Sequence, residues 1–216
     1  MQVSISEALR YLGAGSDAAT EALVRDAAAE LEQKVQPRFV YRVFPVTTAD
    51  AEISLAGLAL PGDMARRMLQ DAGQAVILVC TLGAGFESLL RAAGARDMAR
   101  AAALDACGSA FVETGCDVAE REIAARFPDL YLTDRFSPGY GDLPLTLQPE
   151  VLRLTDAERR LGITLTESLL MVPSKSVTAI LGLCDAPQPA RIRGCAACHL
   201  RETCAFRKRG TTCVAS

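Results

Sequence analysis

The chain has 216 residues and a mass of 23.0 kDa; 50% of its residues are hydrophobic and 23% are charged. This composition is typical of a globular protein and excludes a disordered or collagen-like chain. Aromatic residues make up 5%, tryptophan is absent and the net charge is −3. The stacking surfaces and the basic footprint of nucleic-acid binders are therefore missing, and we expect no nucleic-acid partner.

The charge is distributed unevenly along the chain. From residue 190 onward six Lys and Arg residues stand against one Glu, a net charge of +5, so the first 189 residues carry −8. No stretch reaches the roughly 20 apolar residues that span a bilayer. The first residues also lack the basic and apolar regions of a secretory signal. We therefore expect a cytoplasmic protein with no membrane partner, whose cysteines do not form a disulfide framework.

The first 82 residues predict two helices, three strands and a short helix. Ser4-x-x-Glu7 is a capping box that begins a helix ending at Gly13. A second helix begins at Asp17 or Thr20 and lasts until Pro37. The later runs predict strands over 39–44, 53–60 and 75–82, with a helix over 64–69 between the second and the third.

Gly83-Ala-Gly85 follows the third strand and precedes a helix beginning near Phe86. It is either an incomplete dinucleotide-binding loop or a tight turn from strand to helix, and the turn is the better account. Residues 97–127 then predict one long helix or two abutting ones, rich in alanine and largely buried. Within this stretch, Gly108 and Gly115 permit the close approach of another backbone.

The remaining elements complete an α+β pattern. A short strand over 130–133 precedes a helix from Gln148 to Gly162, and runs over 164–171 and 176–183 have the length of a hairpin. Without strict βαβ alternation, we expect an α+β fold with a mixed, mostly antiparallel sheet and flanking helices. Ala186-Pro-Gln-Pro-Ala190 reads as an extended linker. We therefore expect a domain over 1–185 and a linker with a cysteine-rich tail over 186–216.

The segment Arg135-Phe-Ser-Pro-Gly-Tyr-Gly-Asp-Leu-Pro144 contains two prolines and two glycines, which fix an irregular backbone. It presents an arginine, a hydroxyl group, backbone amides and an aromatic ring. These groups suit a small zwitterionic ligand, because a guanidinium binds a carboxylate through two N–H groups and an aromatic ring packs beside a cation. The residues alone leave two interpretations open, a ligand-binding loop and an ordered surface loop.

Other motifs accompany this segment. Arg135-x-x-Pro-Gly-Tyr140 is followed by Leu161-Gly-Ile-Thr-Leu-Thr-Glu-Ser168 and Met171-x-Pro-x-x-Ser176-Val, and Leu9-Arg-Tyr-Leu-Gly13 lies near the start. Over roughly residues 4–183 the chain resembles the activation domain of vitamin B12-dependent methionine synthase, and its start is similar to that of stand-alone members. The chain is too short to contain the corrinoid, folate and homocysteine modules of the full enzyme. The resemblance therefore implies an accessory protein rather than a complete enzyme.

The resemblance also implies a chemistry. Such domains bind S-adenosylmethionine beside the corrinoid module and support its repair. When cob(I)alamin has been oxidised to inactive cob(II)alamin, one electron and a methyl group from S-adenosylmethionine restore methylcobalamin. Arg135 falls on the family's carboxylate-binding arginine and Ser137 on a position with main-chain contacts, while Gly139 and Tyr140 complete the motif.

The acidic contacts of the family's ligand are less well matched. Asp50 and Glu52 are candidates for one near the N-terminus. A family glutamate on the long helix falls at Ser109, with Glu113 one turn away. Two further polar residues, Glu167 and Lys175, lie either near the ligand or in structural roles, and we favour the structural roles.

The eight cysteines fall into two groups. Those scattered through apolar runs are expected to be small buried hydrophobes: Cys80, Cys107, Cys116 and Cys184. The tail holds Cys195-x2-Cys198-x5-Cys204-x8-Cys213, the ligand count of a tetrahedral zinc or an iron–sulfur cluster, with His199 as a bystander or a replacement ligand. We favour a [4Fe–4S] cluster over zinc, because the implied task is low-potential electron delivery and zinc has no redox chemistry. Free or redox-active thiols are the alternative.

Three hypotheses follow. The first is an accessory subunit that reactivates a methionine synthase without an activation domain of its own, docking on its cobalamin-binding module. The flanking arginines then offset the cluster's charge or recruit an acidic, low-potential electron carrier, and the alternative for them is a solvated basic tail. The second is an activator of other corrinoid methyltransferase proteins. The third is a non-catalytic, zinc-stabilised module that senses S-adenosylmethionine.

Overall fold

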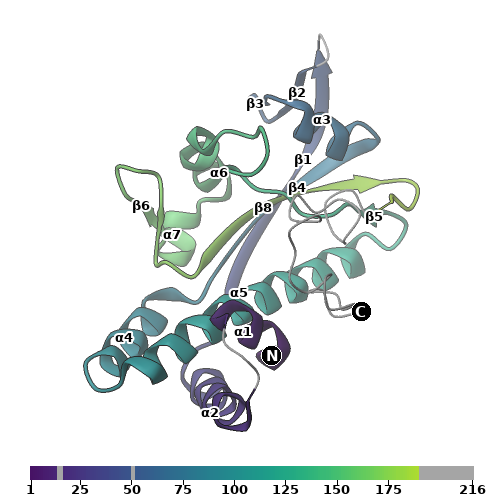
Figure 1. Cartoon of the computed structure of the whole chain (residues 1–216). Coiled ribbons are helices and arrows are strands. Elements are labelled where there is room, and N and C mark those ends of the chain that lie inside the picture. Colours follow the sequence, from purple (N-terminus) through teal and green to yellow (C-terminus); the bar gives the residue numbers. More distant parts are fainter. Residues whose placement is uncertain (14–16, 50–51, 190–216) are drawn as a thin grey trace. The chain divides into compact units, whose positions relative to one another are not determined.

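The computed structural model describes residues 1–13, 17–49 and 52–189 (Figure 1). Its main sheet has six strands in the order β3-β2-β1-β4-β8-β5, and β6 and β7 form a separate two-stranded sheet. The strands are β1 (Arg38–Ala49), β2 (Glu52–Leu55), β3 (Leu58–Leu60), β4 (Ala72–Thr81), β5 (Tyr131–Leu132), β6 (Thr164–Leu165), β7 (Met171–Val172) and β8 (Ser176–Cys184). The pairs β1–β2, β2–β3, β5–β8 and β6–β7 are antiparallel. The expected α+β fold with a mostly antiparallel sheet is therefore confirmed.

The helices account for most of the remaining described residues. They are α1 (Ile5–Leu12), α2 (Ala18–Lys34), α3 (Asp63–Leu69), α4 (Gly83–Gly94), α5 (Met98–Arg126), the short 3₁₀ helix η1 (Leu145–Leu147), α6 (Gln148–Thr155) and α7 (Ala157–Leu161). No helix in the described part combines the length and hydropathy of a bilayer-spanning segment.

The chain divides into two compact units. The first unit comprises residues 1–40, 79–119 and 156–177, and the second comprises 41–78, 120–155 and the described residues from 178 on. Strands β1, β4 and β8 and helix α5 contribute residues to both units. The boundary expected between residues 185 and 186 stays a prediction, because the tail after residue 189 lies outside the described residues.

In the first unit, local signals set the helix ends. The hydroxyl group of Ser4 accepts a hydrogen bond from the Glu7 amide, and Gly13 ends α1 with a φ of +65°. The carboxylate of Asp17 accepts a bond of 2.9 Å from the Thr20 amide at the start of α2. The predicted start at Ser4 is therefore confirmed, and of the two candidates for the second helix, Asp17 and Thr20, Asp17 is the capping residue.

Of the two alternatives for residues 97–127, the structure has the single helix α5, and much of it is buried, as expected. A Cβ at Gly108 would lie 2.4 Å from the Phe86 ring, and one at Gly115 would lie 2.7 Å from both Cys80 Sγ and the Pro37 side chain. Both distances are too short for a side chain, so these glycines are required by packing.

The second unit has its own hydrophobic core. Strands β2, β3, β4 and β8, helices α3 and α6 and the loop after β5 supply it, with the buried residues Ile53, Leu55, Leu60, Ala65, Met68, Leu69, Ala72, Ala75, Ile77, Phe136, Leu143, Val151, Leu154, Ile180 and Cys184. The loop after β5 therefore lies against a packed core.

Two predicted elements are each broken in the structure by a residue at positive φ. The single strand predicted over 53–60 is a hairpin of β2 and β3, because Ala56 and Gly57 have φ values of 51° and 83° and form a two-residue turn. The single helix predicted from Gln148 to Gly162 is broken at Asp156, whose φ is 56°, and Gly162 ends only α7.

The hairpin predicted between 164–171 and 176–183 is wrong. Thr164 pairs with Val172 and Leu165 with Met171 in the small β6–β7 sheet. Strand β8 instead pairs with β5 in the main sheet, Tyr131 opposite Cys184.

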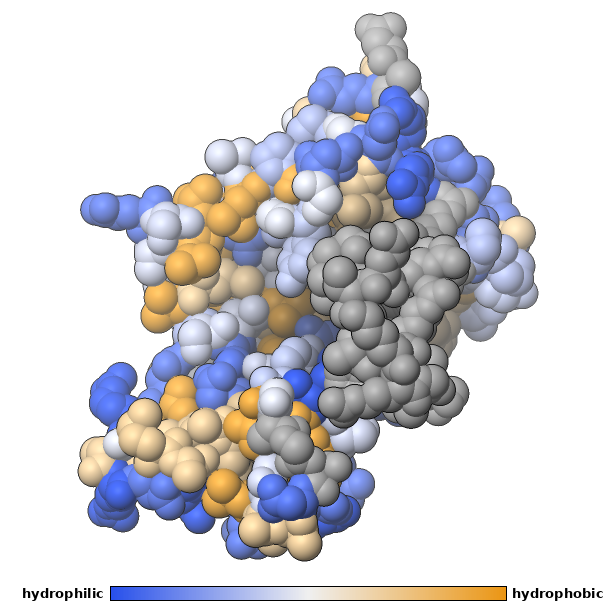
Figure 2. Space-filling view, in the orientation of Figure 1, coloured by the Kyte–Doolittle hydropathy of each residue, from blue (hydrophilic) through white to orange (hydrophobic). Residues whose placement is uncertain are grey.

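Around β6 and α7, Figure 2 shows hydrophobic residues at the surface, and Leu170 and Val172 are among the exposed ones.

Candidate functional site

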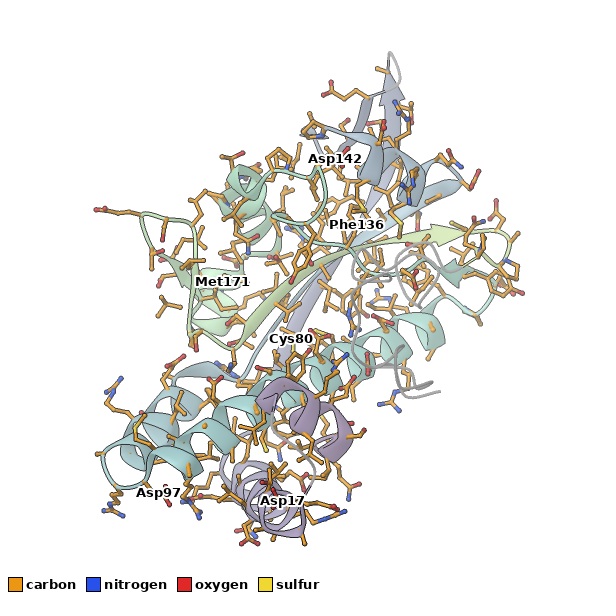
Figure 3. The ribbon with its side chains drawn as sticks, in the orientation of Figure 1. Asp17, Cys80, Asp97, Phe136, Asp142 and Met171 are labelled. Atoms are coloured by element: carbon orange, nitrogen blue, oxygen red, sulfur yellow. The ribbon has the colours of Figure 1, made fainter. Side chains whose placement is uncertain are left out.

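The segment singled out from the sequence, residues 135–144, lies in the second unit, and we call it the ligand loop. Its start is fixed to β8. Phe136 and Ile180 exchange two backbone hydrogen bonds of 3.0 and 2.7 Å, and the Ser137 hydroxyl donates a bond of 2.5 Å to the carbonyl oxygen of Thr178. Because Phe136 is also buried in the core, this end of the loop has a defined position (Figure 3).

A tight turn follows. The amide of Tyr140 donates to the Ser137 carbonyl (3.2 Å), that of Gly139 to the Leu143 carbonyl (2.8 Å), and that of Leu143 to the Tyr140 carbonyl (3.1 Å). Gly139 and Gly141 have φ values of 89° and 60°, a region that glycine enters without strain. Between the two glycines, Tyr140 is 70% exposed. The turn therefore uses its backbone to hold an aromatic ring in solvent.

Arg135 forms an ion pair with Glu120, a residue of α5, through its Nη1 atom and Oε1 of the glutamate. The two side chains are only 13% and 20% exposed. A guanidinium has five N–H donors in a fixed plane, so a carboxylate partner fixes its orientation. The carboxylate-binding residue expected from the sequence is therefore a largely buried cation with a defined orientation.

Asp142 connects the ligand loop to α3. Its carboxylate accepts hydrogen bonds from the backbone amides of Asp63 (2.5 Å) and Met64 (3.0 Å), the first residues of that helix. These two bonds, the Met64 bond first, hold the pKa of Asp142 below its ordinary value of 3.8. The carboxylate therefore serves as the N-terminal cap of a helix 79 residues away in the sequence.

Ser109 and Lys175, two polar positions considered from the family resemblance, belong to the first unit. Lys175 Nζ lies 2.9 Å from Asp105 Oδ1 and donates a hydrogen bond of 2.9 Å to the hydroxyl oxygen of Ser109. Ser109, at the position of the family's glutamate, thus contacts a lysine. Lys175 has the structural contacts that we favoured.

The remaining acidic candidates have varied surroundings. Glu52 begins β2 and is exposed, as is Glu167 between β6 and β7. Glu113 lies on α5 in the first unit, and Asp50 lies outside the described residues. The structure therefore gathers Arg135, Ser137, Gly139 and Tyr140 in one loop, while each of these acidic positions stays a prediction.

The four scattered cysteines are buried, as expected. Burial raises the pKa of the Cys107 thiol to about 12, so it stays protonated at neutral pH and is a poor nucleophile or metal ligand. Within the described ranges, no group of three or more His, Cys, Asp and Glu residues could hold a metal ion. The expected metal ligands Cys195, Cys198, Cys204 and Cys213, and His199, lie outside those ranges.

Gly83 forms the tight turn that we favoured over a dinucleotide loop. Its φ is 73°, and its amide donates a hydrogen bond of 3.0 Å to the hydroxyl oxygen of Thr81. Helix α4 begins at this glycine, three residues before the predicted start.

Two residues that hold the ligand loop in place were not identified from the sequence: Glu120 and Asp142. Glu120 carries no local signal that distinguishes it from the other acids of α5. For Asp142 a signal existed, because α3 begins after Gly62, which has no side chain to cap it. The unmet amides of a helix start require an acceptor from elsewhere in the chain.

The fold and the sequence were then compared with known proteins. The fold is similar to that in the crystal structure of the MetH reactivation domain bound to AdoHcy, with a TM-score of 0.63 and 18% sequence identity over 94% of this chain and 77% of that one. Residues 119–189 match the family model of the vitamin B12 dependent methionine synthase activation domain. The matched segment contains Glu120, the ligand loop and β8, so the resemblance stated from the sequence is confirmed there. A comparison with curated proteins found no match.

Proposed function

We propose that this chain binds S-adenosylmethionine and takes part in the reductive reactivation of a cobalamin cofactor held by a partner protein. The partner is a cobalamin-dependent methionine synthase without an activation domain of its own. S-adenosylmethionine supplies the methyl group, and one electron returns the oxidised cobalt to the state that accepts it. In this role the chain serves as an accessory to the synthase, whose cobalamin is the methyl acceptor.

The observation that carries this proposal is the ligand loop inside the family-matched segment. Arg135 is largely buried and oriented by Glu120, which suits it to bind the ligand's carboxylate through its planar donors. The similar fold of a reactivation domain solved with AdoHcy supports the same class of ligand.

Each residue of the loop has a proposed task. Arg135 binds the carboxylate, and Ser137 supplies main-chain contacts from a backbone that its own side chain fixes to Thr178. Gly139 allows the backbone to turn, and Tyr140 packs against the ligand's adenine ring or sulfonium cation. Tyr140 is mostly exposed, so its ring is open to such a contact.

A reactivation assay tests the proposal. The partner's oxidised corrinoid is mixed with this protein, S-adenosylmethionine and a reductant without air. We expect cob(II)alamin to disappear and S-adenosylhomocysteine to form in equal amount, because each transferred methyl group leaves one such molecule. Arg135→Ala should abolish both signals at limiting S-adenosylmethionine. Full reactivation without S-adenosylmethionine, or without this protein, contradicts the proposal.

We further propose that the four tail cysteines bind a metal centre, with a [4Fe–4S] cluster ahead of zinc. The support is the donor set itself, since four closely spaced thiolates match the ligand number of both. Protein purified without air should contain iron and sulfide and should be brown. Serine in place of Cys195 and Cys198 should remove the colour and slow reactivation with a physiological donor, but not with a strong chemical reductant.

The same experiments separate the other hypotheses. Zinc in a colourless protein that binds S-adenosylmethionine but reactivates no corrinoid supports a sensing module. Reactivation of other corrinoid methyltransferases, but not of methionine synthase, supports a different partner. Capture of the partner from a native extract, followed by its identification, names it directly.

A further inference from the structure

The contact between the ligand loop and α3 joins two parts of the chain that are far apart in sequence. Asp142 accepts hydrogen bonds from the first two amides of α3, at Asp63 and Met64. No side chain of the preceding segment caps this helix, because Gly62 occupies the capping position. The loop therefore supplies the acceptor that the helix lacks. In Figure 3, Asp142 lies beside α3.

Two glycines make the close approach possible, one on each side of the contact. A Cβ at Gly62 would lie 2.6 Å from the carboxylate carbon of Asp142, and one at Gly141 would lie 2.4 Å from the terminal methyl group of Met64. Both glycines also have positive φ values, 96° and 60°. A side chain at either position would therefore displace the facing Asp142 or Met64 side chain and would also strain the backbone.

Helix α3 is itself firmly held. Ala65, Met68 and Leu69 are buried in the core of the second unit, and Met64 packs against that core. Tyr140, in contrast, is mostly exposed, so packing does not fix its ring. The place of Tyr140 is therefore set by its backbone turn, and the far side of that turn is fixed by Asp142.

We propose that Asp142 is a positioning residue that docks the turn of residues 139–143 on α3 and thereby sets the affinity of the ligand loop. This inference rests on the proposed function, in which Tyr140 contacts the adenosyl ligand. An undocked turn samples many backbone conformations, and a ligand then has to order it on binding. The carboxylate does not touch the ligand and acts only through the turn.

The test uses three variants in the full chain. Asp142→Ala removes both acceptor atoms, and Asp142→Asn retains one. Asp63→Ala is the matched control, because Asp63 is an exposed carboxylate at the same helix end whose side chain pairs with Arg66 and not with the loop. Two quantities are measured for each variant: the rate of chymotrypsin cleavage after Tyr140 without ligand, and the dissociation constant for S-adenosylmethionine.

We expect Asp142→Ala to speed cleavage after Tyr140 and to raise the dissociation constant, each by about five- to tenfold, the size expected for a lost helix cap. Asp142→Asn should show a smaller change in both, and Asp63→Ala should match the wild type. Wild-type values in Asp142→Ala overturn the inference. Equal changes in Asp63→Ala also overturn it, since the stability of α3 would then be the cause.

The cleavage rate separates this inference from the proposed function. If the wild type does not bind S-adenosylmethionine, the proposed function is wrong, and the affinity role of Asp142 is wrong with it. Faster cleavage in Asp142→Ala alone would then still establish that Asp142 docks the turn. If cleavage changes and affinity does not, the proposed function stands and the positioning role is wrong.

Discussion

The ligand loop and the turn at residues 173–176, which we call the serine turn, both come from motifs that carry the family resemblance, yet they use their side chains differently. In the serine turn, the amide and hydroxyl groups of Ser174 both donate to Glu87, and the Ser176 hydroxyl donates to the Pro173 carbonyl (2.7 Å). The carbonyl of Lys175 accepts from the Leu82 amide at 3.0 Å. In the ligand loop, Tyr140 extends into solvent.

The two motifs therefore differ in how far contacts within the protein account for their residues. The serine turn fixes the start of β8 against the end of β4, and its contacts account for its polar residues without any ligand. The contacts of the ligand loop account for Ser137, Asp142 and the two glycines, but not for an exposed tyrosine. The proposed ligand would account for the exposed tyrosine of the loop, whereas the serine turn has a structural role without one.

The largest expected effect on stability comes from breaking the ion pair between Arg135 of the ligand loop and Glu120. Glu120→Gln should lower the free energy of unfolding by roughly 3 kcal/mol, because it removes the carboxylate charge that pairs with the largely buried cation of Arg135. Urea denaturation measures this, with Glu122→Gln as the control, since Glu122 is an exposed acid of the same helix. A loss of unfolding free energy no larger than that of the control would show that the Arg135–Glu120 ion pair does not stabilise the fold.

The ion pair behind the serine turn should matter less. The side chain of Asp105 is 52% exposed, so water screens its ion pair with Lys175. Asp105→Asn should therefore lower the free energy of unfolding by about 1 kcal/mol or less. The same denaturation experiment compares it with Glu120→Gln. A cost as large as that of Glu120→Gln would erase the distinction between the two regions.

Tyr140 should show the smallest effect on stability and a clear effect on binding. Tyr140→Ala should change the free energy of unfolding by no more than about 0.5 kcal/mol, because the ring is exposed. Its affinity for S-adenosylmethionine should fall by about 1 kcal/mol from the lost contact with a ring or cation. Thermal melting and calorimetric titration measure the two effects, and unchanged affinity would remove Tyr140 from the site.

The sequence was informative where the signal is local. Ser4 and Gly13 mark helix ends through their own hydrogen bonds and backbone angles, so those ends were predicted correctly, and Asp17 was one of two candidates for the start of α2. The turn at Ala56 and the break at Asp156 were missed. Neither residue type by itself predicts a positive φ, since most alanine and aspartate residues have negative φ values. The pairing of β8 was also missed, since periodicity identifies a strand but not its neighbour.

The same limit applies to the candidate site. The residue types of the ligand loop and its similarity to a known family identified Arg135 and Tyr140. Their supports, Glu120 and Asp142, act through contacts across 15 and 79 residues of sequence. Such pairs depend on the finished fold, and only the uncapped start of α3 pointed to one of them in advance.

Titration calorimetry of S-adenosylmethionine with the wild type, Arg135→Ala and Arg135→Lys tests the central claim most directly. Arg153→Ala is the control, because Arg153 is an exposed arginine of the same unit that pairs with Glu150. We expect Arg135→Ala to lose about 2–5 kcal/mol of binding free energy, the range for losing a buried charged contact. Arg135→Lys should lose less, because it keeps the charge without the planar fork. Wild-type affinity in a folded Arg135→Ala protein would contradict the account.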